Sequence, residues 1–210
     1  MGIKGNRRRE EILRQSGKLF AEKGYTAVTM QQVCGSCRLS RGGLYRYFGS
    51  TKEIFEELLK RRTGPGGEKW KRLMEEGRPA PEILEQALAV LEMEMNSAET
   101  SLSLAVYEYS RVWGGGFIEE LNRKAREKWK SLILYGMERG EFRDVDPEQM
   151  TDIILYVYQG VRLWSRVIPL GEKTGKNIVK KIRKDLVGKH EVQTAGMEKN
   201  GRGRDSAAGQ

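Results

Sequence analysis

The stretch that decides the fold reads Ser40-Arg41-Gly42-Gly43-Leu44-Tyr45-Arg46-Tyr47-Phe48. It predicts a short helix over residues 41–47, with Leu44 and Phe48 four residues apart, so that both can face a core. That arrangement leaves Tyr45 and the two arginines to project outward. Each of the two glycines costs a helix about 1 kcal/mol relative to alanine. Close approach of the backbone to DNA is a physical reason to keep them there.

Two further helices are predicted before this stretch. From Arg7 to Lys23 the apolar residues recur at helical spacing, and Gly24 follows as a stop. Thr29 then begins Thr-Met-Gln-Gln, a capping box closed by Gln32. Because very few residues separate the second helix from the third, the spacing suits a helix-turn-helix, whose third helix enters the major groove. A tight turn between packed helices, without any DNA role, fits the same spacing.

The rest of the chain also shows helical periodicity, and no run alternates for long enough to predict a strand. A second capping box at 50–53 opens a helix to Arg62, and Gly64-Pro65-Gly66-Gly67 then predicts a break and a domain hinge. Further helices are predicted around Trp70 and over roughly 81–96, 99–112, 117–139, 147–168 and 174–187. We therefore expect an all-α fold of about nine helices, divided into domains 1–62 and 63–190, with a disordered tail at 191–210.

Composition excludes a membrane-spanning chain and a purely disordered one. The 210 residues are 38% hydrophobic and 32% charged, which allows a core beside a polar surface. The longest apolar run, 153–158, has six residues, whereas a membrane span needs about 20. No apolar segment follows the basic N-terminus as it would in a secretory signal, so we expect the cytoplasm as the compartment and no membrane partner.

The sequence contains few of the cysteines and histidines that enzymes and metal sites commonly use. Two cysteines exclude a disulfide scaffold, and a single histidine, His190, removes most histidine-based metal sites and nucleophile–base pairs. There is no G-x-S-x-G, phosphate loop, dinucleotide fingerprint or H-E-x-x-H. We expect no catalytic residue, no metal and no cofactor. Besides DNA binding by a ligand-responsive regulator, two other functions fit the sequence. One is a helical small-molecule-binding protein or enzyme with an incidental basic N-terminus, and the other is an architectural DNA-binding protein without an effector.

The net charge of +9 is concentrated near the N-terminus. Residues 1–62 carry 14 Lys and Arg against 6 Asp and Glu, a net of +8, whereas residues 63–190 carry 21 against 20. A basic block next to a neutral one is typical of a nucleic-acid-binding module attached to a second domain. A solvated basic surface is the other interpretation of the charge alone.

The residues from Thr29 to Phe55 resemble the DNA-binding domain of the TetR family of bacterial transcriptional regulators. The specific part is Ser-x-Gly-x-Leu-Tyr-x-Tyr-Phe at 40–48, followed by a capped helix. The resemblance covers roughly 7–62, and the remainder matches only in layout. It implies a homodimer that binds a palindromic operator in double-stranded DNA, usually as a repressor. It also implies that a small-molecule effector enters the C-terminal, effector-binding and dimerisation domain and releases the DNA.

Carried over by position, the resemblance assigns a phosphate contact to Thr29 and groove contacts to residues 41–43. Tyr45 and Tyr47 would bracket a phosphate or a thymine methyl, with Arg46 beside them. The implied DNA-binding set is Thr29, Arg41, Gly42, Gly43, Tyr45, Arg46, Tyr47 and Lys52.

The chain departs from the usual family pattern in three places. Cys34 and Cys37 stand where alanines are usual, and Arg38 stands at a turn position often held by glycine. The lysine that often follows the serine of the fourth helix is Thr51 here. Lys52, one place later, either replaces that lysine's phosphate contact or points elsewhere.

Cys34 and Cys37 also form a C-x-x-C motif on one helix face, so a redox or metal role is conceivable. There is no second cysteine pair and no nearby histidine. We interpret the two as small buried thiols, with a redox switch as the alternative.

Polar and aromatic residues of the second domain are candidates for the effector site. Gln159 and Arg162 interrupt an otherwise apolar helix and could orient a polar or anionic ligand group. The candidate set is Met93, Tyr107, Trp113, Tyr156, Gln159 and Arg162, with core or dimer packing as the alternative for most of them. The wide apolar faces of 147–168 and 174–187 predict pairing with their copies in a second subunit, and ordinary packing within one domain is the alternative.

Overall fold

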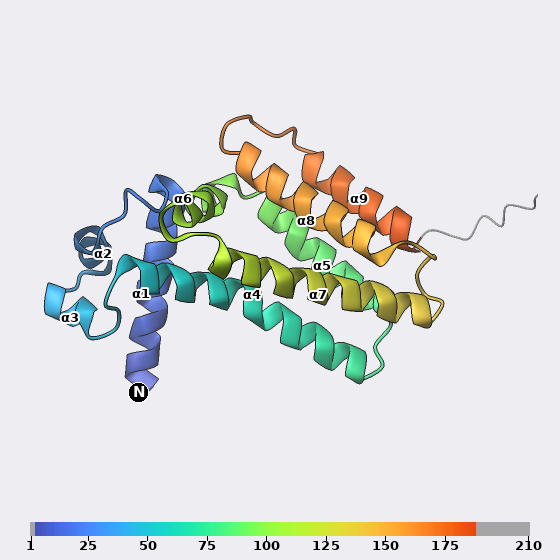
Figure 1. Cartoon of the computed structure of the whole chain (residues 1–210), viewed down its shortest axis with the longest axis horizontal. Coiled ribbons are helices and arrows are strands. Elements are labelled where there is room, and N and C mark those ends of the chain that lie inside the picture. Colours follow the sequence, from blue (N-terminus) through green and yellow to red (C-terminus); the bar gives the residue numbers. More distant parts are fainter. Residues whose placement is uncertain (1–2, 188–210) are drawn as a thin grey trace, which may run out of the picture.

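The computed structural model of the protein describes residues 3–187, so the expected tail at 191–210 and His190 lie outside the described residues. The described chain holds nine α-helices and one 3-10 turn and no strand, which confirms the all-α prediction for that part of the chain (Figure 1). The helices are α1 (Ile3–Lys23), α2 (Met30–Cys37), α3 (Arg41–Tyr45), α4 (Thr51–Glu75), α5 (Ala80–Met95), α6 (Ser103–Trp113), α7 (Gly116–Glu138), α8 (Pro147–Trp164) and α9 (Thr174–Val187), with the 3-10 turn η1 at Ala98–Thr100.

Helices α2 and α3 begin where the sequence predicts, whereas α1 begins at Ile3, four residues before the predicted start at Arg7. The Thr29 hydroxyl accepts from the amide of Gln32, and the Gln32 side chain accepts from the amide of Thr29, which completes the capping box of α2. The Ser40 hydroxyl accepts from the amide of Gly43 at 3.1 Å and so starts α3. Helix α3 ends two residues earlier than predicted, because the amides of Tyr47 and Phe48 both turn back to the carbonyl of Leu44.

The N-terminal core is built by α1–α4 together with a helix from much later in the chain. Phe20 of α1 meets Phe55 of α4 with ring centroids 4.8 Å apart, and Tyr25 meets Tyr109 of α6 at 5.1 Å. Leu102, Ala105 and Tyr109 are all buried in the same apolar cluster as the residues of α1, α2 and α3. Figure 1 shows α6 beside α1, at the junction between the N-terminal helices and the rest of the molecule. One core therefore joins the predicted DNA-binding domain to the second domain.

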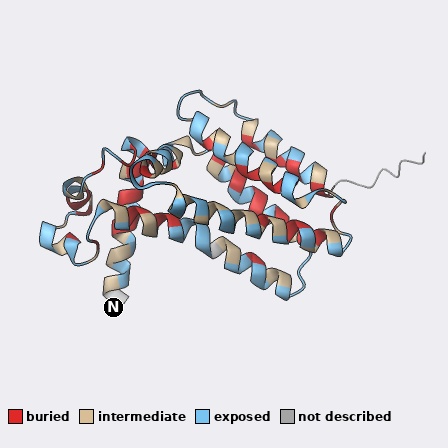
Figure 2. Ribbon diagram, in the orientation of Figure 1, coloured by how far each residue is buried: buried red, intermediate tan, exposed pale blue. Residues whose placement is uncertain are grey.

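A second core fills the bundle of α5, α7, α8 and α9 with the C-terminal half of α4. Its buried residues form the inner faces of these helices (Figure 2). Trp70 of α4 packs edge-on against Trp129 of α7, with ring centroids 4.8 Å apart. Helix α4 contributes Phe55 to the first core and Trp70 to the second, so it crosses from one core to the other.

The predicted break at Gly64-Pro65-Gly66-Gly67 is wrong, because α4 continues from Thr51 to Glu75. Tertiary packing overrides the weak helix propensity of this segment. A Cβ on Gly66 would lie 3.4 Å from Nζ of Lys128, so α7 approaches the helix closely at the small residues. The proposed boundary between residues 62 and 63 therefore falls inside one continuous helix.

Two other helix ends differ from the prediction. Residues 98–100 form the 3-10 turn η1, so α6 begins at Ser103 and not near residue 99. Helix α8 ends at Trp164 instead of Ile168, because the amides of Val167 and Ile168 both donate to the carbonyl of Trp164 in a closing turn.

The continuity of α4 can be tested with a pair of glycine substitutions. A Cβ at Gly64 meets nothing within 4 Å, so Gly64→Ala should raise the free energy of unfolding by about 0.5–1 kcal/mol. Gly77, just past the end of α4, also has open space but a φ of +71°, so Gly77→Ala should cost about 1–2 kcal/mol. Urea unfolding measures both. Destabilisation by Gly64→Ala would mean that α4 breaks at the glycines.

Candidate nucleic-acid interface

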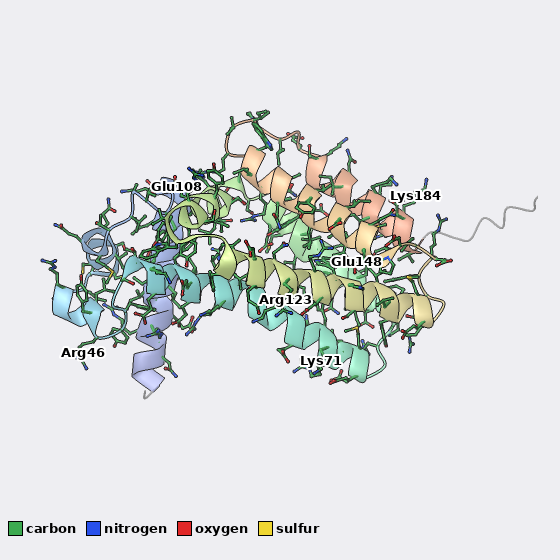
Figure 3. All side chains as sticks on the ribbon, in the orientation of Figure 1. Arg46, Lys71, Glu108, Arg123, Glu148 and Lys184 are labelled. Carbon is green, nitrogen blue, oxygen red and sulfur yellow. The ribbon has the colours of Figure 1, made fainter. Side chains whose placement is uncertain are left out.

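Helices α2 and α3 form one end of the molecule, and Arg46 lies there, away from both cores (Figure 3). Leu44 is fully buried and Phe48 nearly so, and together they anchor α3 in the N-terminal core. Arg41, Gly42 and Arg46 are exposed. The predicted division of α3 into an inward apolar side and an outward basic side is therefore present in the structure.

The two tyrosines implied for DNA binding differ in their surroundings. Tyr45 is 48% exposed, and its ring stands free on the outer side of α3. Tyr47 is half-buried and packs against the N-terminal core. Gly43 is half-buried too, and its amide donates to the Ser40 hydroxyl in the cap of α3. Six of the eight residues implied for DNA binding lie on α3 or just after it. Four of these six are exposed: Arg41, Gly42, Tyr45 and Arg46.

Thr29 lies exposed at the N-terminus of α2. Its hydroxyl oxygen already accepts from the amide of Gln32 at 3.3 Å, which leaves the hydroxyl hydrogen as the group that could reach a phosphate. The unpaired amides of a helix N-terminus favour an anion in the same place. The position therefore suits a phosphate contact on both counts.

Arg9 holds the end of α3, a role that the sequence analysis missed. Its guanidinium donates to the carbonyl of Tyr47 at 2.6 Å, pairs with the Glu57 carboxylate, and lies 4.0 Å from the centroid of the Phe48 ring. The hydrogen bond to Glu57 raises the pKa of Arg9, and burial opposes that effect. Arg9 thus connects α1, α3 and α4. Its place in a run of three arginines gave no signal of this role.

Lys52 points toward α6. Its ammonium pairs with Glu56 one turn along α4 and lies 5.3 Å from the centroid of the Trp113 ring. Glu56 also accepts from the hydroxyl of Tyr109. Burial raises the pKa of Glu56, but the hydrogen bonds from Lys52 and Tyr109 more than offset it, so the pKa lies below its ordinary value. A phosphate contact by Lys52 would compete with this pairing.

The turn between α2 and α3 carries backbone strain at Arg38. Its φ of 53° is the only positive φ at a non-glycine residue in residues 3–187, and this conformation costs an L-residue about 1–2 kcal/mol. Arg8 of α1 supports the turn by donating to the carbonyl of Cys37 at 3.1 Å. The exposed Arg38 adds a further cation beside α3.

Cys34 and Cys37 lie in the N-terminal core, 7% and 5% exposed. Burial raises the pKa of the Cys37 thiol, so it is a poor nucleophile at neutral pH. Both features favour the interpretation of small packing residues over a redox switch.

The six candidate effector residues differ in their surroundings. Met93, Tyr107 and Tyr156 are about 60% exposed. Trp113 donates from its indole nitrogen to the hydroxyl of Tyr25 at 2.7 Å, so it contacts the N-terminal core. Arg162 alone is buried, at 6% exposed. Gln159, the sixth, is exposed and donates to the Asn122 side chain at 3.3 Å.

An apolar depression lies on the outer face of α8 and α9. It is lined by Ile153, Val157, Asn177, Ile178, Lys181 and Ile182. Ile153 is 51% exposed and Val157 36%. Contiguous apolar side chains that are exposed to water mark a surface that binds another molecule. Among residues 3–187, no helix is long and apolar enough to cross a bilayer.

A basic third helix presented outward by a helix-turn-helix defines a DNA-binding protein. Residues 12–58 match the family model described as bacterial regulatory proteins, tetR family. The N-terminal domain therefore matches the DNA-binding domain of the TetR family of bacterial transcriptional regulators, and that family and the relatives of the chain are regulators, not enzymes.

Relatives and solved structures extend this match beyond the N-terminal domain. The chain is 25% identical over 145 residues to the HTH-type transcriptional repressor KstR2 of Rhodococcus jostii (strain RHA1), covering 67% of this chain and 71% of that protein. It is 28% identical over 147 residues to the uncharacterised regulator YfiR of Bacillus subtilis (strain 168), covering 68% and 71%. The fatty acid degradation regulator FadR from Bacillus halodurans shares the fold with a TM-score of 0.68 at 18% identity, over 91% of this chain and 98% of that one.

The burial of the two thiols predicts that they are protected in the folded protein. A thiol reagent at neutral pH should react slowly with the native chain and rapidly with both cysteines in denaturant, since both thiols are buried and burial also raises the pKa of Cys37. The rate of reaction of each thiol is measured from the colour that the reagent releases. Rapid reaction of the native protein, with loss of DNA binding on mild oxidation, would instead support a redox switch.

Proposed function

We propose that the protein is a ligand-responsive transcriptional repressor that binds a palindromic operator as a homodimer and is released by a small-molecule effector. The exposed Arg41 and Tyr45 on α3, and Arg46 just after it, carry the DNA-binding part of this proposal. The net charge of +8 in residues 1–62 supports it, because lysines and arginines there neutralise phosphates. Such a regulator acts in the cytoplasm, where bacterial DNA lies.

The residues of the interface divide into two roles. Arginine can bond guanine through two parallel hydrogen bonds, which makes Arg41, at the start of α3, the candidate for base recognition. Thr29, Tyr47 and Lys52 lie at helix starts or near the core, where contact with phosphate would fix the register of the protein on the duplex. Gly42 and Gly43 allow the backbone of α3 to approach the groove without side chains in the way.

The dimer would form through the outer face of α8 and α9. Pairing the two helices with their copies covers Ile153 and Val157 in a four-helix contact. Two-fold symmetry then presents two α3 helices, and successive major grooves on one side of the duplex require them to lie about 34 Å apart. An effector releases the DNA only if it binds more tightly to a dimer in which this distance is wrong.

The two roles predict different effects of single substitutions. Arg41→Ala should weaken binding to the preferred duplex by about 1–3 kcal/mol while changing a scrambled duplex little. Lys52→Ala should weaken both duplexes alike and lower the salt dependence by about one charge. Fluorescence anisotropy measures both, on duplexes that the wild-type protein enriches from a random pool and on scrambled versions. Equal loss on both duplexes for Arg41→Ala would remove its base-reading role.

The dimer predicts a concentration-dependent mass. Sedimentation at micromolar concentration should show twice the chain mass of 24.0 kDa. Val157→Asp should shift the equilibrium to the monomer, because it would bury a charge without a partner. Leu134→Asp on α7 is the matched control, since Leu134 is equally exposed at 36% and lies off this face. A wild-type protein that sediments only as the monomer would refute the dimer.

A further inference from the structure

Two arginines from two helices, Arg62 of α4 and Arg162 of α8, converge on η1, and Lys128 of α7 lies against α4 at Gly66, one turn after Arg62. These three residues are called here the cationic cluster, in which Arg62 is exposed and Lys128 half-buried. Arg162 is 6% exposed. It donates from Nη1 to the carbonyl of Glu94 at 2.7 Å and from Nη2 to the carbonyl of Thr100 at 3.4 Å. Nη1 of Arg62 donates to the same Thr100 oxygen, also at 3.4 Å. Two guanidinium groups thus converge on one neutral carbonyl, through hydrogen bonds of marginal length.

The charge of the cationic cluster is not balanced. Within the described residues, none of the three cations forms an ion pair with a carboxylate within 4 Å. Glu94 is the acid that acts on Arg62 and Lys128, and its carboxylate already accepts from the hydroxyl of Tyr158. Burial lowers the pKa of Arg62, and the charge of Arg162 lowers it further. Burial also lowers the pKa of Lys128.

Such an arrangement is costly unless something compensates for it. Arg162 is buried without a paired carboxylate, and a buried charge of this kind destabilises a fold unless other contacts offset the loss of water. The two arginine forks that converge on Thr100 from different helices are, however, suited to a carboxylate or a phosphate. Lys128 lies 4.4 Å from the centroid of the Trp70 ring, and Trp70 packs on Trp129, so apolar surface adjoins the charges.

We infer that the cationic cluster binds the anionic group of the effector, a carboxylate or a phosphate on an apolar organic body. This inference rests on the proposed function and assigns a chemical class to its effector. Arg62 and Arg162 donate to the anion in place of the Thr100 carbonyl, and Lys128 supplies the third charge. The apolar body lies toward Trp70.

The Thr100 carbonyl gives this site a route to the DNA-binding helices. Thr100 ends η1, and α6 begins three residues later. Glu108 of α6 accepts from the amide of Thr26 at 2.9 Å and from its hydroxyl at 3.0 Å, and Trp113 bonds Tyr25. Figure 3 shows Glu108 where α6 meets the N-terminal helices. An anion that takes both arginines away from Thr100 frees the start of α6, which can then shift together with the N-terminal core.

The test uses four probes with one apolar chain and different head groups: octanoate, octyl phosphate, 1-octanol and octyltrimethylammonium. The two anions should raise the melting temperature of the full-length protein and release bound DNA, whereas the alcohol and the cation should do neither. Octanoate acting alone would identify a carboxylate effector, and octyl phosphate acting alone would identify a phosphate ester. Equal effects of anions, alcohol and cation, including no effect of any, would overturn the inference.

Lys128→Met locates the site, because Lys128 is only half-buried and its loss leaves both arginines in place. It should weaken binding of the active anion by about tenfold or more in a calorimetric titration. Lys124→Met is the matched control, one turn away on α7 and paired with Glu120 on the surface, and it should bind the anion as the wild type does. Equal weakening by both variants would place the anion elsewhere.

Failure of this inference and failure of the proposed function give different results. Melting temperatures are measured without DNA, so a protein that selects no duplex can still be stabilised by the anions. A protein that binds its selected duplex tightly but distinguishes none of the four probes would keep its DNA-binding function and lose the anion site.

Discussion

The packing of Tyr109 among Phe20, Tyr25 and Phe55 is the contact on which the rest of the structure depends. It inserts a side chain of α6 into the core that supports α3, with ring centroids 5.1 Å from Tyr25 and 5.3 Å from Phe55. Aromatic pairs of this geometry each add about 0.5–1.5 kcal/mol beyond the area that they bury. The hydroxyl of Tyr109 also donates a hydrogen bond to the Glu56 carboxylate on α4. The orientation of the DNA-binding helices is therefore set by α6 as well as by their own short connections.

This shared core explains how one fold can combine two functions. Helix α4 contributes to both cores and α6 to the first, so in the proposed mechanism a change among α4, α7 and α8 would reach α3 without a flexible hinge. The coupling needs no large energy, because a tenfold change in operator affinity corresponds to about 1.4 kcal/mol. Exchanging two long hydrogen bonds at the Thr100 carbonyl for bonds to an anion is within this range.

The sequence predicted the N-terminal domain well, because its signals are local. Thr29 and Ser40 cap their helices as the pattern indicates, and Leu44 and Phe48 face the core. The continuation of α4 through four helix-weakening residues depends on contact with α7, which no local pattern records. Arg162 was recognised as unusual in an apolar helix, but its partners Arg62 and Lys128 lie far away in the chain. Tyr107 and Tyr156 are exposed and stay predictions as effector candidates, since residue type alone does not reveal which side of a helix is covered.

Native-state hydrogen exchange tests the shared core most directly. If α6 is part of the N-terminal core, its slowest amides should open with the same free energy as those of α1 and the first half of α4, as one cooperative unit. Exchange of α6 together with α5 and α8, at a free energy different from that of α1, would contradict the account.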